Sequence, residues 1–185
     1  GDIACPTMMS KKIPVIQNHL SIEGQSDVCI GEAVLFTLPL LGSTEYNWSI
    51  TPTTGVNTYM MTQSNEIRLV FNQANTYQLR CSYRCDFLDC GPYEAEPLTI
   101  VVRPKFDITG NNQVCVSNAC DLQTSPSVNA SWVAYDLSNS NQVEASSSGT
   151  SFSHTFSHPG RFLVTAEHPS YCGPATFVLT VKDVP

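Results

Sequence analysis

The sequence CSYRCDFLDCG places three cysteines, Cys81, Cys85 and Cys90, within ten residues. Zinc sites usually use paired Cys-x-x-Cys or Cys-x-x-His units, and thioredoxin-type redox sites use Cys-x-x-Cys. Neither spacing occurs here, and no histidine is nearby. If residues 81–85 are extended, Cys81 and Cys85 lie on one face about 13 Å apart, too far to share a metal. The segment therefore favours structural cysteines over metal, cofactor or redox chemistry.

Composition and charge exclude several classes of partner. The chain has 185 residues, 14% charged and 42% apolar, with a formal net charge of −7. Acidic residues are spread along the chain, and the few basic residues do not cluster into a basic face. We therefore expect no nucleic-acid partner. No apolar run approaches the ~18 residues of a membrane helix, so we expect no membrane insertion. No secretory signal is visible, and we expect a mature segment of a longer protein. Eight cysteines, an even number, favour an oxidising, extracytoplasmic compartment.

Nothing in the sequence positions a catalytic group. It contains no paired carboxylates, Gly-x-Ser-x-Gly elbow or phosphate-binding loop, so we expect no enzyme activity. Three histidines cluster near the C-terminus. His154 alternates with Phe152 and Phe156 on one predicted strand face, which favours a satisfied buried or rim histidine over a metal ligand.

The chain contains an internal repeat. The segments LSIEGQSDVC (Leu20–Cys29) and FDITGNNQVC (Phe106–Cys115) share Ile-x-Gly-x-x-x-Val-Cys. Further segments of the first unit match segments of the second unit in the same order. The matched pairs are Trp48 and Trp132, IRLVF and FSHTF, NTYQLRC and GRFLVTA, Cys90-Gly91-Pro92 and Cys172-Gly173-Pro174, and PLTIVV and TFVLTV. The order and near-constant offset indicate a tandem duplication.

Each unit is predicted to be all-β. Polar and apolar residues alternate in AVLFTL, EIRLVF, TYQLRC and RFLVTA, and Gly, Pro, Asn and Ser cluster between these runs. Short strands at this spacing without helical periodicity predict a sandwich or barrel. The Ser- and Asn-rich segment 137–151 is predicted to be a solvated loop around a short strand.

Each unit resembles the Ig-like/PKD-like β-sandwich domains of bacterial surface and secreted proteins. The motifs that carry the resemblance are Ile-x-Gly-x-x-x-Val-Cys, the tryptophan strand, the two alternating strands and Cys-Gly before the last strand. The resemblance implies two tandem domains stapled by disulfides. We expect an N-terminal extension over 1–19 and domains over 20–103 and 104–185, joined by a short linker around Pro104 that favours a semi-rigid rod.

The repeated cysteines suggest the disulfide pairing. Cys29 and Cys115 are equivalent, as are Cys90 and Cys172, so the duplication predicts Cys29–Cys90 and Cys115–Cys172 bonds within the two units. An antibody-like Cys29–Cys81 bond is the competing arrangement. The first unit holds five cysteines and the second holds three. Either one bond joins the units or at least two thiols stay free, and the pairing of the other four cysteines (Cys5, Cys81, Cys85 and Cys120) stays open.

Several aromatic and methionine residues are candidates for contact with a partner. Trp48 and Trp132 are expected in the cores, where sandwiches keep a buried tryptophan. Phe87 and Leu88, between two aspartates in the connection before the last strand, form a candidate contact loop, or they plug the end of the core. A second possible contact segment is Tyr59, Met60 and Met61.

The sequence therefore predicts a non-catalytic binding, adhesion or spacer module of a larger secreted or cell-surface protein. Its expected partner is a protein or glycan at the cell surface. The alternative is a pair of accessory domains attached to a secreted hydrolase that targets carbohydrate or protein. The family has no shared ligand site, so the resemblance supplies no site residue.

Overall fold

A computed structural model describes residues 19–42, 44–59, 64–85 and 90–183. Within those residues the secondary structure consists of strands and turns, without a helix. The described part accordingly contains no helix that is long and apolar enough to cross a membrane.

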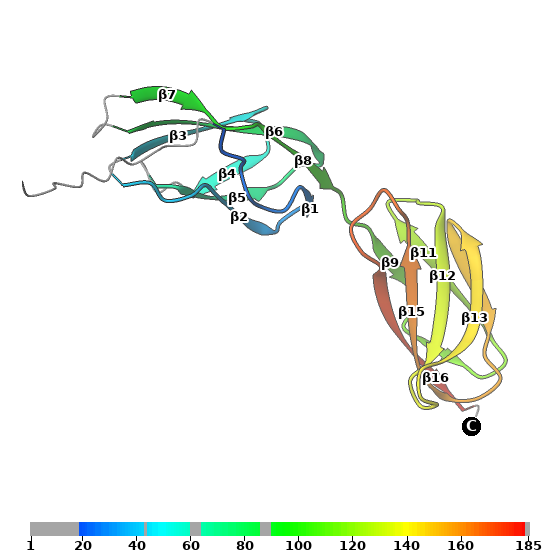
Figure 1. The fold of residues 1–185 in the computed structure, drawn as a ribbon. Coiled ribbons are helices and arrows are strands. Elements are labelled where there is room, and N and C mark those ends of the chain that lie inside the picture. Colours follow the sequence, from blue (N-terminus) through cyan, green and yellow to red (C-terminus); the bar gives the residue numbers. More distant parts are fainter. Residues whose placement is uncertain (1–18, 43, 60–63, 86–89, 184–185) are drawn as a thin grey trace, which may run out of the picture.

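The strands form two β-sandwiches that lie end to end and meet at an angle (Figure 1). One core includes buried residues from Leu20 to Val102, and a separate core includes buried residues from Phe106 to Val181. The predicted fold class, two tandem Ig-like β-sandwich domains, is confirmed by this architecture. The domain bounds at 103/104 stay a prediction, which the two cores support.

The first domain packs a five-stranded sheet against a three-stranded one. The larger sheet contains β1 (Asp27–Cys29), β8 (Leu98–Arg103), β6 (Asn75–Cys85), β3 (Thr44–Thr51) and β7 (Cys90–Glu94). The smaller sheet contains β2 (Ala33–Thr37), β5 (Glu66–Phe71) and β4 (Val56–Tyr59). β1 pairs with β8 in parallel, whereas β8, β6 and β3 pair antiparallel.

The second domain has a similar arrangement. Its larger sheet contains β10 (Gln113–Cys115), β16 (Ala175–Lys182), β15 (Gly160–Glu167), β12 (Ala130–Asp136) and β13 (Gln142–Gly149). Its smaller sheet contains β14 (Ser151–Thr155), β11 (Ala119–Ser125) and β9 (Asp107–Gly110). β10 pairs with β16 in parallel, as β1 pairs with β8.

The two tryptophans lie in the cores, as predicted. Trp132 is fully buried and Trp48 is nearly so. Each indole N–H donates to a backbone carbonyl, that of Ser64 at 3.0 Å from Trp48 and that of Gly149 at 2.8 Å from Trp132. The indoles therefore fill the centres of the sandwiches without leaving a buried donor unpaired.

The domains differ in one strand. β4 pairs with β5 in the smaller sheet, but β13 pairs with β12 in the larger sheet and forms its edge. The prediction of a short strand within 137–151 underestimated β13, which runs for eight residues. Its Ser-rich stretch is held by backbone pairing to β12, from Ala130 opposite Gly149 to Asp136 opposite Gln142.

Candidate functional site at the domain junction

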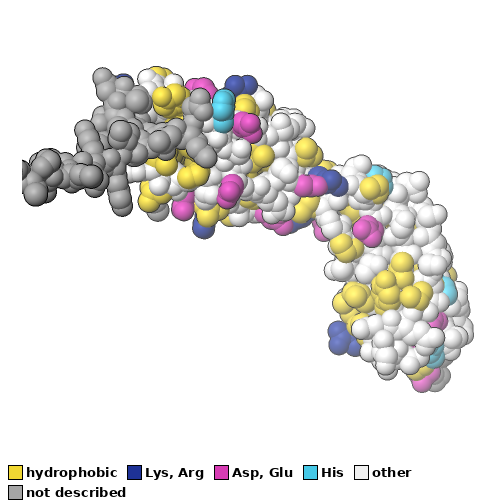
Figure 2. Space-filling view, in the orientation of Figure 1, with side chains coloured by type: hydrophobic (Ala, Val, Ile, Leu, Met, Phe, Trp, Pro, Cys, Tyr) yellow, Lys and Arg dark blue, Asp and Glu magenta, His cyan; other side chains and the backbone are white. Residues whose placement is uncertain are grey.

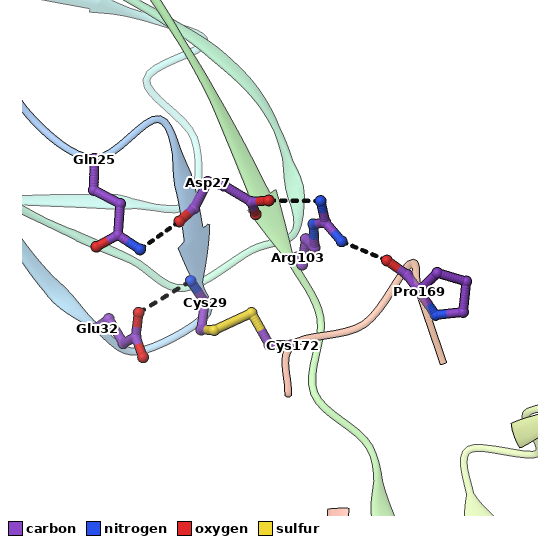
Figure 3. The surroundings of a disulfide bond; sticks show 7 residues. All are labelled: Gln25, Asp27, Cys29, Glu32, Arg103, Pro169 and Cys172. Atoms are coloured by element: carbon purple, nitrogen blue, oxygen red, sulfur yellow. Dashed lines mark hydrogen bonds and ion pairs between the residues drawn. A yellow bond between two sulfur atoms is a disulfide. The ribbon is translucent and has the colours of Figure 1, made fainter. Parts of the chain in front are cut away.

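A disulfide joins the two domains. Cys29, the last residue of β1, is bonded to Cys172, which lies in the turn before β16 (Figure 3). The two Cα atoms lie 5.5 Å apart although the cysteines are 143 residues apart in sequence. This separation is typical of a disulfide.

The first domain holds Cys29 at its end, beside the point where the chain leaves. Parallel pairing of β1 with β8 sets Cys29 opposite Arg103, the last residue of β8. Beyond Cys29, the Ile30 N–H donates to the Arg103 carbonyl at 3.1 Å, and the Gly31 N–H donates to the Phe71 carbonyl at 2.8 Å. The position of Cys29 is therefore fixed by backbone pairing.

The second domain holds Cys172 against the linker. The Cys172 N–H donates to the Pro104 carbonyl at 2.9 Å. In the same turn, the Tyr171 N–H donates to the His168 carbonyl at 3.0 Å, and the Tyr171 ring packs edge-on against Phe106 with centroids 5.1 Å apart. The turn is thus anchored to the first residues of its own domain.

Arg103 connects the first domain to this turn. Its guanidinium lies 2.5 Å from the Asp27 carboxylate and also donates to the Pro169 carbonyl (Figure 3). The Arg103 side chain is 36% exposed and that of Asp27 is 54% exposed. An ion pair this exposed stabilises a fold by at most about 1 kcal/mol. We therefore assign Arg103 a role in orienting the turn rather than in overall stability.

The predicted disulfide pairing was wrong. The structure bonds Cys29 to Cys172 in place of the predicted Cys29–Cys90 and Cys115–Cys172 bonds, and Cys115 is free. The competing bond to Cys81 is also wrong, since Cys81 is a free, buried thiol. The duplication argument assumed that each unit closes its own bond, but the first cysteine of the repeated pair in one unit can instead bond to the second cysteine of the pair in the next unit. The uneven division of the cysteines predicted that one bond joins the units or that at least two thiols stay free. Both conditions occur, since Cys29–Cys172 joins the units and Cys81, Cys115 and Cys120 are free.

The other predicted positions lie mostly outside the described residues. Cys90 begins β7, and its backbone is paired with Cys85 of β6, but neither side chain is among those described. Phe87, Leu88, Met60 and Met61 fall outside the described residues. Tyr59 ends β4, and its side chain is not among those described either. Both candidate contact segments therefore stay predictions.

The histidines of the second domain contact aromatic and acidic groups. His154 packs between Phe152 and Phe156, which confirms the rim position, but its buried Nε2 has no hydrogen-bond partner and lies 3.8 Å from the Glu144 carboxylate. The predicted satisfied histidine is therefore wrong in that respect. Within the described residues, no group of three or more His, Cys, Asp or Glu side chains is placed to hold a metal ion.

A row of apolar side chains crosses the outer face of the larger sheet in the second domain. Val143, Tyr135, Leu163 and Val178 are successive register partners on β13, β12, β15 and β16. Val143 is 54% exposed and Val178 is 44% exposed, while the other two are half-buried. Figure 2 shows hydrophobic side chains gathered over this sheet. This face was not predicted, because the alternation of residues along each strand does not show which strands are neighbours.

The solved structures to which this chain is similar share little sequence with it. No family model and no curated protein matches the chain. Among solved structures, three N-terminal domains of the bacteriophage RB49 highly immunogenic outer capsid protein (Hoc) are 12% identical, with a TM-score of 0.39. The match covers 89% of this chain and 59% of that one. A titin fragment is 9% identical, with a TM-score of 0.32, over 89% of this chain and 100% of its own. The assignment to tandem Ig-like domains accordingly rests on the strand order and pairing described above.

Proposed function

We propose that this chain is a non-catalytic spacer and binding segment of a larger secreted or cell-surface protein. The observation that carries the proposal is the Cys29–Cys172 bond, which links the two domains covalently at their junction. A bond inside one domain stabilises that domain, whereas a bond between domains restricts how they move relative to each other.

The short linker acts in the same direction. Only three residues, Arg103, Pro104 and Lys105, separate the last buried residue of the first core from the first of the second. Proline restricts this segment further. With the peptide chain and the disulfide as two covalent connections, the domains have little freedom to bend or rotate. Such a unit holds whatever flanks it at a fixed distance and orientation.

The disulfide also supports the proposed location. Disulfides persist in secreted and surface proteins and are rare in the cytosol, where thiols are kept reduced. A junction that depends on a disulfide keeps its geometry only in an oxidising compartment. We therefore place the working form of the protein outside the cytoplasm.

Small-angle X-ray scattering of the monomer at low concentration tests the spacer role. We expect one rigid arrangement to fit the oxidised protein, whereas Cys172→Ser requires an ensemble of domain orientations. Cys115→Ser is the matched control, because it removes a thiol of the second domain that forms no bond. Equal rigidity of the protein and the Cys172→Ser variant, or an oxidised protein that itself needs an ensemble, would contradict the proposal.

The apolar row favours a second role, contact with another copy of the chain through the outer face of β15. Strand alternation sets Arg161, Leu163, Thr165 and Glu167 on this face, with both charged side chains exposed. A second copy placed face to face, with its β15 antiparallel, sets Arg161 of each copy against Glu167 of the other. The face is therefore self-complementary about a two-fold axis, with apolar contacts between the charged ends.

Sedimentation equilibrium over a range of concentrations tests this contact. We expect a concentration-dependent dimer that Leu163→Glu abolishes. The control Leu40→Glu, at a 78% exposed site in the first domain, adds the same charge and leaves the dimer intact. Arg161→Glu should weaken the dimer, and adding Glu167→Arg should restore it. A protein that stays monomeric at millimolar concentration excludes this role.

A further inference from the structure

The turn that holds Cys29 recurs around Cys115 with the same backbone hydrogen bonds. Cys115 is set opposite Lys182, the last residue of β16, as Cys29 is set opposite Arg103. The Val116 N–H donates to the Lys182 carbonyl at 2.8 Å, and the Ser117 N–H donates to the Phe156 carbonyl at 3.0 Å. These bonds are the counterparts of those from Ile30 and Gly31 in the first domain.

The following residues agree as well. Asn118 N–H donates to the Cys115 carbonyl at 3.1 Å, as Glu32 N–H does to that of Cys29. Ser117 takes a left-handed φ of 66°, where the first domain has Gly31 at 84°. Serine adopts this conformation at some cost. The second domain therefore keeps the turn although it lacks the glycine that would form it without strain.

Cys115 has the geometry of a junction cysteine but forms no bond. Its thiol is free and half-buried, beside the residue at which the chain leaves the last strand. Asn118, Ala119 and Lys182 line a shallow depression next to it. A depression at the equivalent end of the first domain is lined by Glu32 and Ala33, the counterparts of Asn118 and Ala119.

We propose that Cys115 is the attachment site for a further Ig-like domain, which follows β16 and presents a turn like Cys172-Gly173-Pro174. The bond would repeat the Cys29–Cys172 bond at the next junction, so that each domain is linked covalently to its successor. This inference extends the proposed spacer function to the partner domain. Lys182 takes the place of Arg103 and provides a donor for a carbonyl of the incoming turn. Gln113 takes the place of Asp27, so the lysine has no acidic partner like that of Arg103 at this position.

The bond forms by thiol–disulfide exchange with a small disulfide such as oxidised glutathione. One of the two thiols, as its thiolate, attacks the small disulfide, forming a mixed disulfide and releasing one reduced thiol. The second cysteine then attacks the mixed disulfide and releases the other thiol. The two cysteines lose two electrons and two protons in total, and the small disulfide is reduced to two thiols.

A chain of three domains tests the inference. The full chain is extended after Lys182 with a second copy of residues 104–182, whose Thr176 is changed to Ser to give its peptides a distinct mass. The protein is refolded in a glutathione redox buffer and digested without reduction. We expect Cys115 to be linked to the marked copy in most molecules, while Cys29 stays linked to the unmarked Cys172.

Two variants of this chain separate geometry from tethering. Cys115→Ser in the unmarked copy should lose the new bond. Cys115→Ser with Asn118→Cys moves the thiol three residues along the same surface, and it should form the bond in a much smaller fraction of molecules. If this shifted thiol bonds as completely as Cys115, or if Cys115 stays free in the three-domain chain, the inference is overturned. Failure here leaves the Cys29–Cys172 junction and its scattering test untouched, so the two proposals fail separately.

Discussion

Cys29 and Cys172 belong to different domains, yet each is held within hydrogen-bonding range of the same short linker. The residue after Cys29 donates to the Arg103 carbonyl, and Cys172 itself donates to the Pro104 carbonyl. The disulfide therefore closes a small structural unit around two consecutive linker residues. Rigidity at this point fixes both domains, because the two cores have no other covalent connection among the described residues.

Removal of the disulfide should destabilise both domains. Cys29 lies beside Arg103 in the folded first domain, and Cys172 lies beside Pro104 in the folded second domain. The bond therefore closes a loop of roughly 70 residues when either domain unfolds alone, which corresponds to about 4 kcal/mol in the chain-entropy model. We expect the double variant Cys29→Ser/Cys172→Ser to lose up to this free energy of unfolding per domain, measured by urea denaturation with Trp48 and Trp132 fluorescence. Cys115→Ser should change it far less. An unchanged midpoint for the double variant would show that the bond does not restrict the unfolded chain.

The three free thiols among the described residues should differ in reactivity. Cys81 is fully buried, and this burial raises the pKa of its thiol to about 12. Burial also raises the pKa of Cys120, whereas Cys115 is half-exposed. Because the thiolate is the reactive form, iodoacetamide at pH 8 should label Cys115 in the native protein and label Cys81 and Cys120 only after unfolding. Mass spectrometry of the digest gives the order, and labelling of Cys81 as fast as Cys115 would contradict the structure.

Gly110 should not tolerate a side chain. Its φ is +153°, and an added Cβ would lie 2.5 Å from Leu122 Cδ2 and 2.8 Å from the Asp121 carbonyl oxygen. Gly110→Ala should therefore destabilise the second domain by roughly 1–3 kcal/mol. Gly160→Ala is the matched control, because its added Cβ meets neighbours only at 3.4 Å or more. Equal denaturation midpoints for the two variants would show that the close contacts around Gly110 do not require a glycine there.

Acid should destabilise the second domain through Asp136. The hydrogen bond with His158 lowers the pKa of the Asp136 carboxyl below its ordinary 3.8. Burial acts in the opposite direction, and a hydrogen bond donated by the Ser138 N–H lowers the pKa further. The unfolded chain therefore takes up this proton at a higher pH than the folded domain does. The stabilisation is fully present above about pH 4 and is lost as pH falls through the folded-state pKa.

Asp136→Asn should accordingly lower stability at neutral pH and flatten its decline in acid. Urea denaturation between pH 2 and 7 gives the profile. Asp121→Asn, on the exposed face of β11, is the control and should keep the steep acid limb. The same slope in the Asp136→Asn variant as in the unaltered protein would contradict the assigned role.

The sequence predicted the fold because the signals for it are local. Alternation identified β2, β5, β6 and β15, and the repeated order of motifs identified two copies. The Ile-x-Gly motif is also recognisable as a short local pattern, although its cause is a contact with the neighbouring strand: Gly24 and Gly110 share a positive φ, and an added Cβ at either would collide with a core side chain. Features fixed within one strand or turn are visible in one sequence.

The junction and the apolar face were not predicted, because both depend on distant parts of the chain. Cys29 meets Cys172 only because β1 runs parallel to β8 and ends beside the linker. The register of four strands brings Val143 and Val178 into one row. A usable signal existed: Cys29 ends the first strand of one unit and Cys172 precedes the last strand of the next, which allows a bond between units.

Non-reducing peptide mapping tests the central claim most directly. Free thiols are alkylated in the native protein, and pepsin digestion at acidic pH then suppresses thiolate exchange. The structure predicts a linked peptide pair that contains Cys29 and Cys172, with Cys115 recovered in alkylated form. Peptides that join Cys29 to Cys90 and Cys115 to Cys172 would show instead that each domain closes its own bond, and the covalent junction would be refuted.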